Sequence, residues 1–98
     1  MVRSSGFGDR DVFGIRLALE EAIRHGFEHQ KKREGSCRLR LRYHLGEDGL
    51  LLELESEKTA LFLPEQCEKS VGVMRHFMTE VRLHEQGRGI TLYKRRSA

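Results

Sequence analysis

Apolar residues recur at helical spacing in two stretches of the chain. Between residues 12 and 27 they fall three or four positions apart, on one face of an α-helix, and they are Val12, Ile15, Leu19, Ala22, Ile23 and Phe27. Asp9 or Asp11 can cap the start of this helix by accepting hydrogen bonds from its first free amides, and Gly35 suits its left-handed exit. The same spacing predicts a second helix that carries Val71, Met74, Phe77, Met78 and Val81.

Two other stretches alternate between apolar and polar positions, which is the pattern of a β-strand with one buried face. From Cys37 to Leu45 the odd positions are apolar, and the even positions hold Arg38, Arg40, Arg42 and His44. The turn 46–49 leads to leucines at 50, 52 and 54, with Glu53 and Glu55 on the opposite face. The pattern returns on both sides of a turn at 86–89, and the sequence therefore predicts two β-hairpins. In the first, the arginine row can lie across from the glutamates, at roughly 0.2–1 kcal/mol for each pair.

The predicted order is helix, two strands, irregular segment, helix, two strands. We expect residues 1–8 to form a flexible arm and residues 9–96 to form a single domain. The fold class is α+β: two helices packed on one face of a four-stranded sheet, mixed but largely antiparallel. We predict an irregular segment at 56–70, around Pro64.

Composition narrows the classes of function. The chain has 98 residues, of which 38% are hydrophobic, and no apolar run approaches the roughly 20 residues of a membrane span. Its N-terminus lacks the apolar stretch of a signal peptide, so we expect a cytoplasmic protein with no membrane partner. Cys37 and Cys67 have no metal-ligand spacing and are expected to be buried thiols. The net charge of +3 allows an acidic partner without requiring one.

Two segments together resemble the GHKL ATPase superfamily, and most closely the anti-sigma-factor serine kinases of bacterial partner-switching circuits. Residues 15–25 read Ile-Arg-Leu-Ala-Leu-Glu-Glu-Ala-Ile-Arg-His, where the family has an Ala-Leu-Glu-Glu-Ala run that ends in asparagine. Residues 71–81 resemble the family's Leu-Met-Arg helix, and residues 90–95 its closing hairpin. The resemblance covers residues 11–96, has no counterpart of the family's first strand and helix, and implies a truncated, Bergerat-like histidine-kinase ATPase domain.

The resemblance implies where a catalytic base and a magnesium ligand would lie. Glu21 occupies the position of the family glutamate that activates the attacking hydroxyl. His25 occupies the position of the asparagine that coordinates magnesium, and an imidazole is a poor ligand for a hard cation that prefers oxygen. A second alignment places the asparagine on Glu21 and the base on Leu17, and it also removes the magnesium ligand.

The other nucleotide-contacting positions are substituted as well. The aspartate that bonds adenine falls on Ser56, and the glycines after it fall on Lys58 and Ala60. The lid glycines fall on Glu68 and Ser70. Glycines let backbone approach a nucleotide closely, and their loss implies that ATP and magnesium are not bound as cofactors. We expect Lys58, Glu68, Leu61 and Leu63 to fill the space between the first helix and the sheet, where the family binds its nucleotide.

Three functions from different classes remain open. The first is a non-catalytic regulator that binds a sigma factor or an anti-sigma antagonist, with a homodimer that covers an unpaired sheet edge or the helix faces. The second is an active serine-protein kinase that uses Glu21 with ATP and magnesium. The third is a nucleic-acid-binding module formed by the arginine row and the basic residues 94–96. Glu53 and Glu55 would neutralise that row, and no aromatic residues interleave with it.

Three short motifs have simpler readings. His25 to His29 matches a zinc-peptidase pattern, but it lies in a helix rich in His and Glu, and such sites need a third ligand. Gly87-Arg-Gly89 lies between two alternating runs and indicates a hairpin turn. Cys67 has only Lys69 as a basic neighbour and is expected to be a passive thiol.

Overall fold

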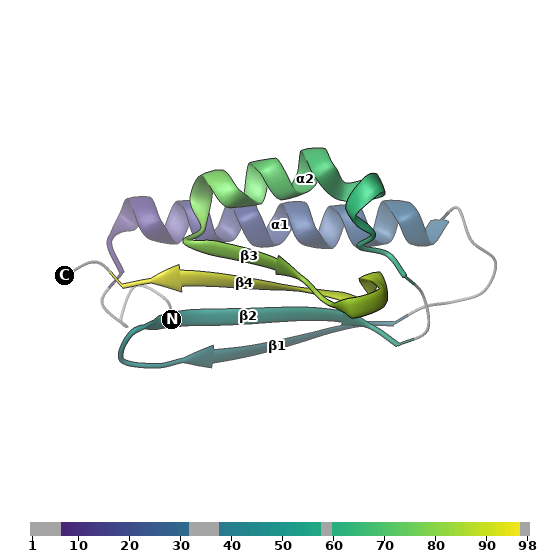
Figure 1. Ribbon diagram of the computed structural model, residues 1–98. Helices are drawn as coiled ribbons and strands as arrows, with labels where there is room; N and C mark the ends of the chain where they lie inside the picture. Colours follow the sequence, from purple (N-terminus) through teal and green to yellow (C-terminus); the bar gives the residue numbers. More distant parts are fainter. Residues whose placement is uncertain (1–6, 32–37, 58–59, 97–98) are drawn as a thin grey trace.

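The computed structural model describes residues 7–31, 38–57 and 60–96. Within these residues the chain forms two α-helices, four strands and a short 3-10 helix (Figure 1). In chain order they are α1 (Asp9–Lys31), β1 (Leu39–Leu45), β2 (Gly49–Ser56), α2 (Pro64–Phe77), β3 (Glu80–Leu83), η2 (Glu85–Gly87) and β4 (Gly89–Arg95).

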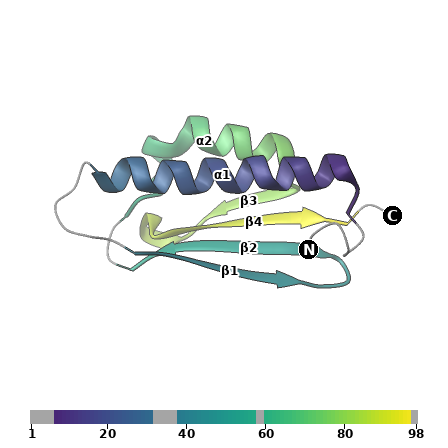
Figure 2. The ribbon, with the colours of Figure 1, turned by 180° about the vertical axis from the view of Figure 1, so that it is seen from behind.

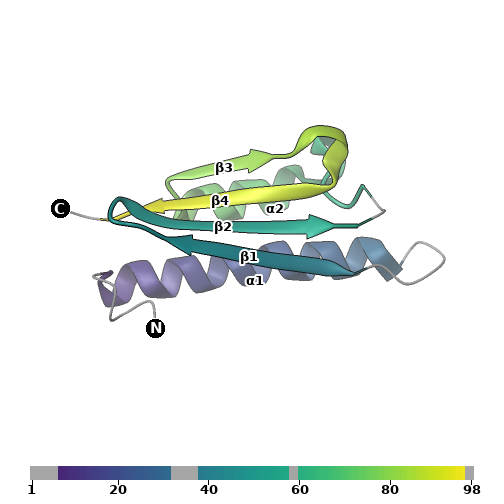
Figure 3. The ribbon, with the colours of Figure 1, turned by 90° about the horizontal axis from the view of Figure 1, so that it is seen from below.

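The four strands form one sheet in the order β1-β2-β4-β3, and both helices lie on the same face of it (Figures 1 and 2). Seen from below, the opposite face carries no helix (Figure 3). This confirms the expected α+β, two-layer architecture. Each neighbouring pair of strands is antiparallel, so the expectation of a mixed sheet was wrong in that detail.

The core lies between the sheet and the two helices. Alternate residues of β2 and β4 point toward the helices and are buried, as are the small residues Ala18 and Ala22 of α1. The largest fully buried side chains are Phe62, Leu61, Met74, Ile90, Leu92 and Cys67. Phe7 is also buried, with the guanidinium of Arg96 stacked 5.6 Å from its ring centroid.

The second helix begins earlier than the apolar spacing predicted. It begins at Pro64, because proline needs no amide partner in the first helical turn, and the segment expected to be irregular is helical from that residue on. The backbone kinks at Cys67, whose thiol is 3.0 Å from the carbonyl oxygen of Leu63. The helix ends at Phe77, and the apolar spacing that continued to Val81 belongs instead to β3.

The first hairpin sets its arginines across from its glutamates, as predicted, but one of its faces is less covered than expected. Arg40 lies opposite Glu55 and Arg42 opposite Glu53, and the ion pairs run diagonally, from Arg42 to Glu55 at 2.8 Å and from Arg40 to Glu57 at 3.6 Å. Helix α1 covers β1 only at Leu39, which is partly buried beside Gly26. The apolar row of β1 therefore stays exposed, by 43% at Leu41, 64% at Tyr43 and 41% at Leu45.

The turn of the second hairpin requires a glycine at position 87. Gly87 has a φ of +68°, and a Cβ there would lie 2.7 Å from a methyl carbon of Leu63. We expect Gly87→Ala to lower the free energy of unfolding by about 1–2 kcal/mol, because an L-residue is strained in the left-handed region. Urea denaturation followed by circular dichroism measures this loss.

Gly72 provides a control of opposite sign. It lies in the exposed part of α2, and a Cβ there would meet nothing within 4 Å. Gly72→Ala should therefore raise the free energy of unfolding by about 0.5–1 kcal/mol, because alanine loses less backbone entropy in a helix. If both substitutions left the free energy of unfolding unchanged, the backbone conformation at position 87 would not require a glycine.

Candidate functional site

Three of the positions singled out by the sequence meet where α1 packs against α2. The hydroxyl of Ser70 donates a hydrogen bond to Oε2 of Glu21 at 2.7 Å and lies 3.3 Å from Nδ1 of His25. Nε2 of His25 lies 2.9 Å from the carbonyl oxygen of Leu61. We call these three side chains the Glu21–His25–Ser70 cluster. Helical spacing places Glu21 and His25 one turn apart on α1, and the packing of α2 brings Ser70 between them.

The hydrogen bonds determine the tautomer of His25. A carbonyl oxygen can only accept, so Nε2 must carry the proton that it donates to Leu61. In the neutral ring Nδ1 is then an acceptor that faces the hydroxyl oxygen of Ser70. His25 is only 3% exposed, and burial lowers the pKa of its imidazole, as does the nearby His29. The hydrogen bond to Leu61 and the charge of Glu21 oppose this decrease without cancelling it, and His25 is therefore neutral at pH 7.

The carboxylate of Glu21 is engaged by groups on both helices. Burial alone would raise its pKa, but hydrogen bonds from Arg24 and Ser70 outweigh that effect, and the pKa lies below the usual value. Arg24 forms a close ion pair with Glu21 and a second one with Glu28 at 2.7 Å. Glu21 is therefore ionised at neutral pH, and both of its oxygens accept hydrogen bonds from the protein.

Aromatic rings occupy the space around His25. The ring centroid of Phe62 lies 5.5 Å from that of His25, and the ring of His29 lies 4.2 Å away. Phe62 is fully buried. Sequence reasoning missed Phe62, although an aromatic residue between two leucines just before a proline was a signal for a buried segment.

Four residues were expected to fill the space between α1 and the sheet, and the structure buries some of them and exposes others. Leu61 is fully buried, as expected. Leu63 is half-buried and lies against the position of Gly87, and Glu68 is exposed on α2, so the expectation for Glu68 was wrong. Glu68 falls on an outward position of the helix, whereas Ser70 and Val71 face inward. Lys58 lies outside the described residues.

Two other predicted site residues, Ser56 and Ala60, lie within the described part of the chain. Ser56 is buried at the end of β2, where its amide donates to the carbonyl of Arg88 at 2.7 Å. Ala60 is half-buried in the segment that leads to α2. Of the sequence-predicted positions, Glu21, His25 and Ser70 therefore form the site.

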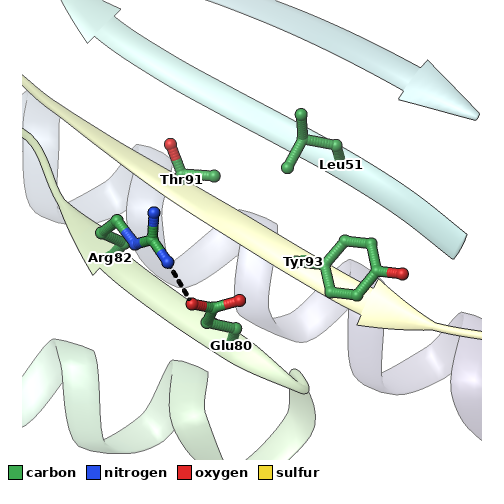
Figure 4. A pocket seen from close by; sticks show the side chains of 5 residues that line it. All are labelled: Leu51, Glu80, Arg82, Thr91 and Tyr93. Atoms are coloured by element: carbon green, nitrogen blue, oxygen red, sulfur yellow. Dashed lines mark hydrogen bonds and ion pairs between the residues drawn. The ribbon is translucent and has the colours of Figure 1, made fainter.

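Two hollows lie elsewhere on the surface. One, of about 220 Å³, is on the open face of the sheet, where Glu80 pairs with Arg82 beside Tyr93 (Figure 4). The other lies where the start of α1 meets the end of α2, and there Lys94 donates to the carbonyl of Phe77 at 2.9 Å and lies 3.6 Å from Asp11. Neither hollow is lined by a member of the cluster.

The described residues contain no group of three or more histidine, cysteine, aspartate or glutamate side chains placed to hold a metal ion. Within the same ranges, neither helix is both long and apolar enough to span a membrane.

No protein-family model matches the chain, and no curated protein matches it. The structure itself defines a two-layer α+β domain with a hydrogen-bonded polar cluster between its two helices.

Proposed function

We propose that the chain is a non-catalytic regulatory protein of the bacterial partner-switching type, which acts in the cytoplasm by binding a sigma factor or an anti-sigma antagonist protein. The resemblance of residues 15–25 and 71–81 to anti-sigma-factor kinases supports the class. The Glu21–His25–Ser70 cluster supports the loss of catalysis, because the groups at the base and lid positions are bonded to each other and the group at the metal position is bonded to Leu61.

Each of these groups would have to give up a partner before it could contact a nucleotide. Glu21 would release Ser70 or Arg24, and His25 would release the carbonyl of Leu61. A hydrogen bond of this kind contributes a net of about 0.5–1.5 kcal/mol, and a buried carbonyl left without a donor costs about 1–3 kcal/mol. His25 would still offer nitrogen to a cation that prefers oxygen. A regulator that binds protein partners requires none of these changes.

Calorimetric titration with ATP and Mg²⁺ tests the absence of catalysis. We expect no saturable binding at nucleotide concentrations of about 1 mM, which correspond to roughly −4 kcal/mol of binding free energy. We also expect the double variant His25→Asn, Ser56→Asp to remain inactive in binding, because Phe62 and Leu61 still fill the space beside α1. Saturable micromolar binding that Glu21→Ala abolishes would instead support the serine-protein kinase.

A second experiment tests the proposed partners. It measures the binding of this protein to the sigma factors and anti-sigma antagonists of the source bacterium, each purified separately. We expect one of them to bind with an affinity that ATP does not change, and without phosphate transfer to a serine of the partner. Binding is tested up to about 100 µM, which corresponds to a binding free energy of roughly −5 kcal/mol. If none of these proteins binds at that concentration, the proposed class of partner is wrong.

A further inference from the structure

β1 is an edge strand with an unused hydrogen-bonding side. It ends the strand order β1-β2-β4-β3, and the described residues place no strand on its outer side. The amide of Gly46 donates to the carbonyl of Gly49 at 2.9 Å, in register with the pairing of Leu45 and Leu50. Bonded pairs alternate along an antiparallel ladder, so the even residues of β1 point their amides and carbonyls at β2. The odd residues, including Leu41 and Tyr43, point theirs away from the sheet.

The two faces of β1 differ in chemistry. On the helix side it exposes the apolar row Leu41, Tyr43 and Leu45. On the open side it carries Arg40 and Arg42, whose side chains are 59% and 58% exposed even though each forms an ion pair with a glutamate. A guanidinium has five N–H donors, which is more than one ion pair uses.

We propose that β1 receives one strand of a partner protein in which apolar residues alternate with glutamate or aspartate. This inference rests on the proposed function and specifies the surface that the partner recognises. β2 already shows this pairing on the other side of β1, with Leu54 opposite Leu41 and Glu53 opposite Arg42. A fifth strand with the same pattern would bond the free amides, cover the apolar row from the side and place acidic groups beside the arginines.

A second copy of the chain fits this edge poorly. In an antiparallel pair, residues opposite one another lie on the same face of the sheet, so the apolar rows of two β1 strands can match only when the cationic rows also match. The registers centred on residues 40, 41 or 42 set Arg40 or Arg42 opposite an arginine of the partner copy, and like charges directly opposite are destabilising. The partner strand is therefore acidic and comes from a different protein.

The test uses synthetic peptides of nine residues that alternate valine with glutamate, and a matched peptide that alternates valine with lysine. Binding is measured by fluorescence anisotropy on the whole chain. We expect the glutamate peptide to bind at least tenfold more tightly than the lysine peptide, and we expect the double variant Arg40→Gln, Arg42→Gln to lose most of this preference.

Two variants of Tyr43 distinguish the contribution of its backbone amide to peptide binding from that of its side chain. Tyr43→Pro removes an amide that points away from β2, so the first hairpin keeps its ladder, whereas Tyr43→Ala keeps the amide. We expect at least a tenfold loss of binding with proline and a smaller loss with alanine, while circular dichroism and the melting temperature show that both variants fold.

Other outcomes contradict the proposal in distinguishable ways. If neither peptide binds, or both bind equally, the arginines serve only to keep the edge from pairing. A dimer in light scattering that Tyr43→Pro dissociates would assign the edge to a second copy. If the peptides fail but a sigma factor or antagonist binds and Tyr43→Pro leaves that binding unchanged, the proposed function stands and its surface lies elsewhere.

Discussion

Phe62→Ala is expected to lower the free energy of unfolding by about 3–5 kcal/mol, the range for removing a fully buried phenylalanine ring. Phe62 is 0% exposed, and its amide donates to the carbonyl of Gly87 at 2.8 Å, which fixes the segment before α2 against the second hairpin turn. The ring fills the space beside His25, so its loss leaves a cavity that the backbone cannot easily close. Urea denaturation monitored by circular dichroism measures the change.

The matched control is Phe13→Ala. Phe13 is 61% exposed on α1, and we expect its removal to change the free energy of unfolding by less than about 1 kcal/mol. If Phe62→Ala cost no more than this control, the space beside α1 would not be filled by the phenylalanine ring, and the case against a nucleotide pocket would weaken.

His25→Ala is expected to cost about 2–4 kcal/mol, from the cavity it leaves and from the unpaired carbonyl of Leu61. Nε2 of His25 is the hydrogen-bond donor that this carbonyl accepts at 2.9 Å. The control is His44→Ala on the open face of β1, where the side chain is exposed and the expected change is within about 0.5 kcal/mol. The same urea experiment measures both variants.

The cost of His25→Ala should also depend on pH. Burial lowers the pKa of His25 in the folded chain, whereas in the unfolded chain it returns to its usual value near 6.5. As the pH falls below 6.5 the unfolded state takes up the proton first, so the contribution of His25 to stability falls, by at most about 1.4 kcal/mol per pH unit. Between pH 7 and pH 5 the difference between wild type and His25→Ala should narrow. A constant difference would show that the folded chain protonates as readily as the unfolded one.

Local patterns in the sequence were sufficient for part of the fold. Helical spacing predicted α1, and alternation predicted both hairpins with an arginine row across from the glutamates, because periodicity reports which side chains share a face. The start of α2 was missed because Pro64 was taken as a break, although proline is also favoured in a first helical turn.

The site was less accessible to sequence reasoning because it depends on contacts between distant residues. His25 meets the carbonyl of Leu61 across 36 positions, and Ser70 meets Glu21 across 49. Spacing within a helix cannot show which side chain of another helix lies opposite. The resemblance marked Glu21 as kept and His25 and Ser70 as changed, and the packing of α2 shows that Ser70 bonds Glu21 and lies beside His25. Phe62 matches none of the family's site positions, so its place beside His25 is known only from the structure.

The strand order has a consequence for folding. β2 and β4 pair at the centre of the sheet, and they come from two successive units of one helix and one hairpin, residues 9–56 and 64–95. Neither unit can form the β2–β4 hydrogen bonds without the other. The chain must therefore lose the entropy of closing the loop between β2 and β4 before these bonds contribute to stability. The protein should therefore unfold in a single cooperative transition, with no stable half, and fold more slowly than a helical bundle of its size.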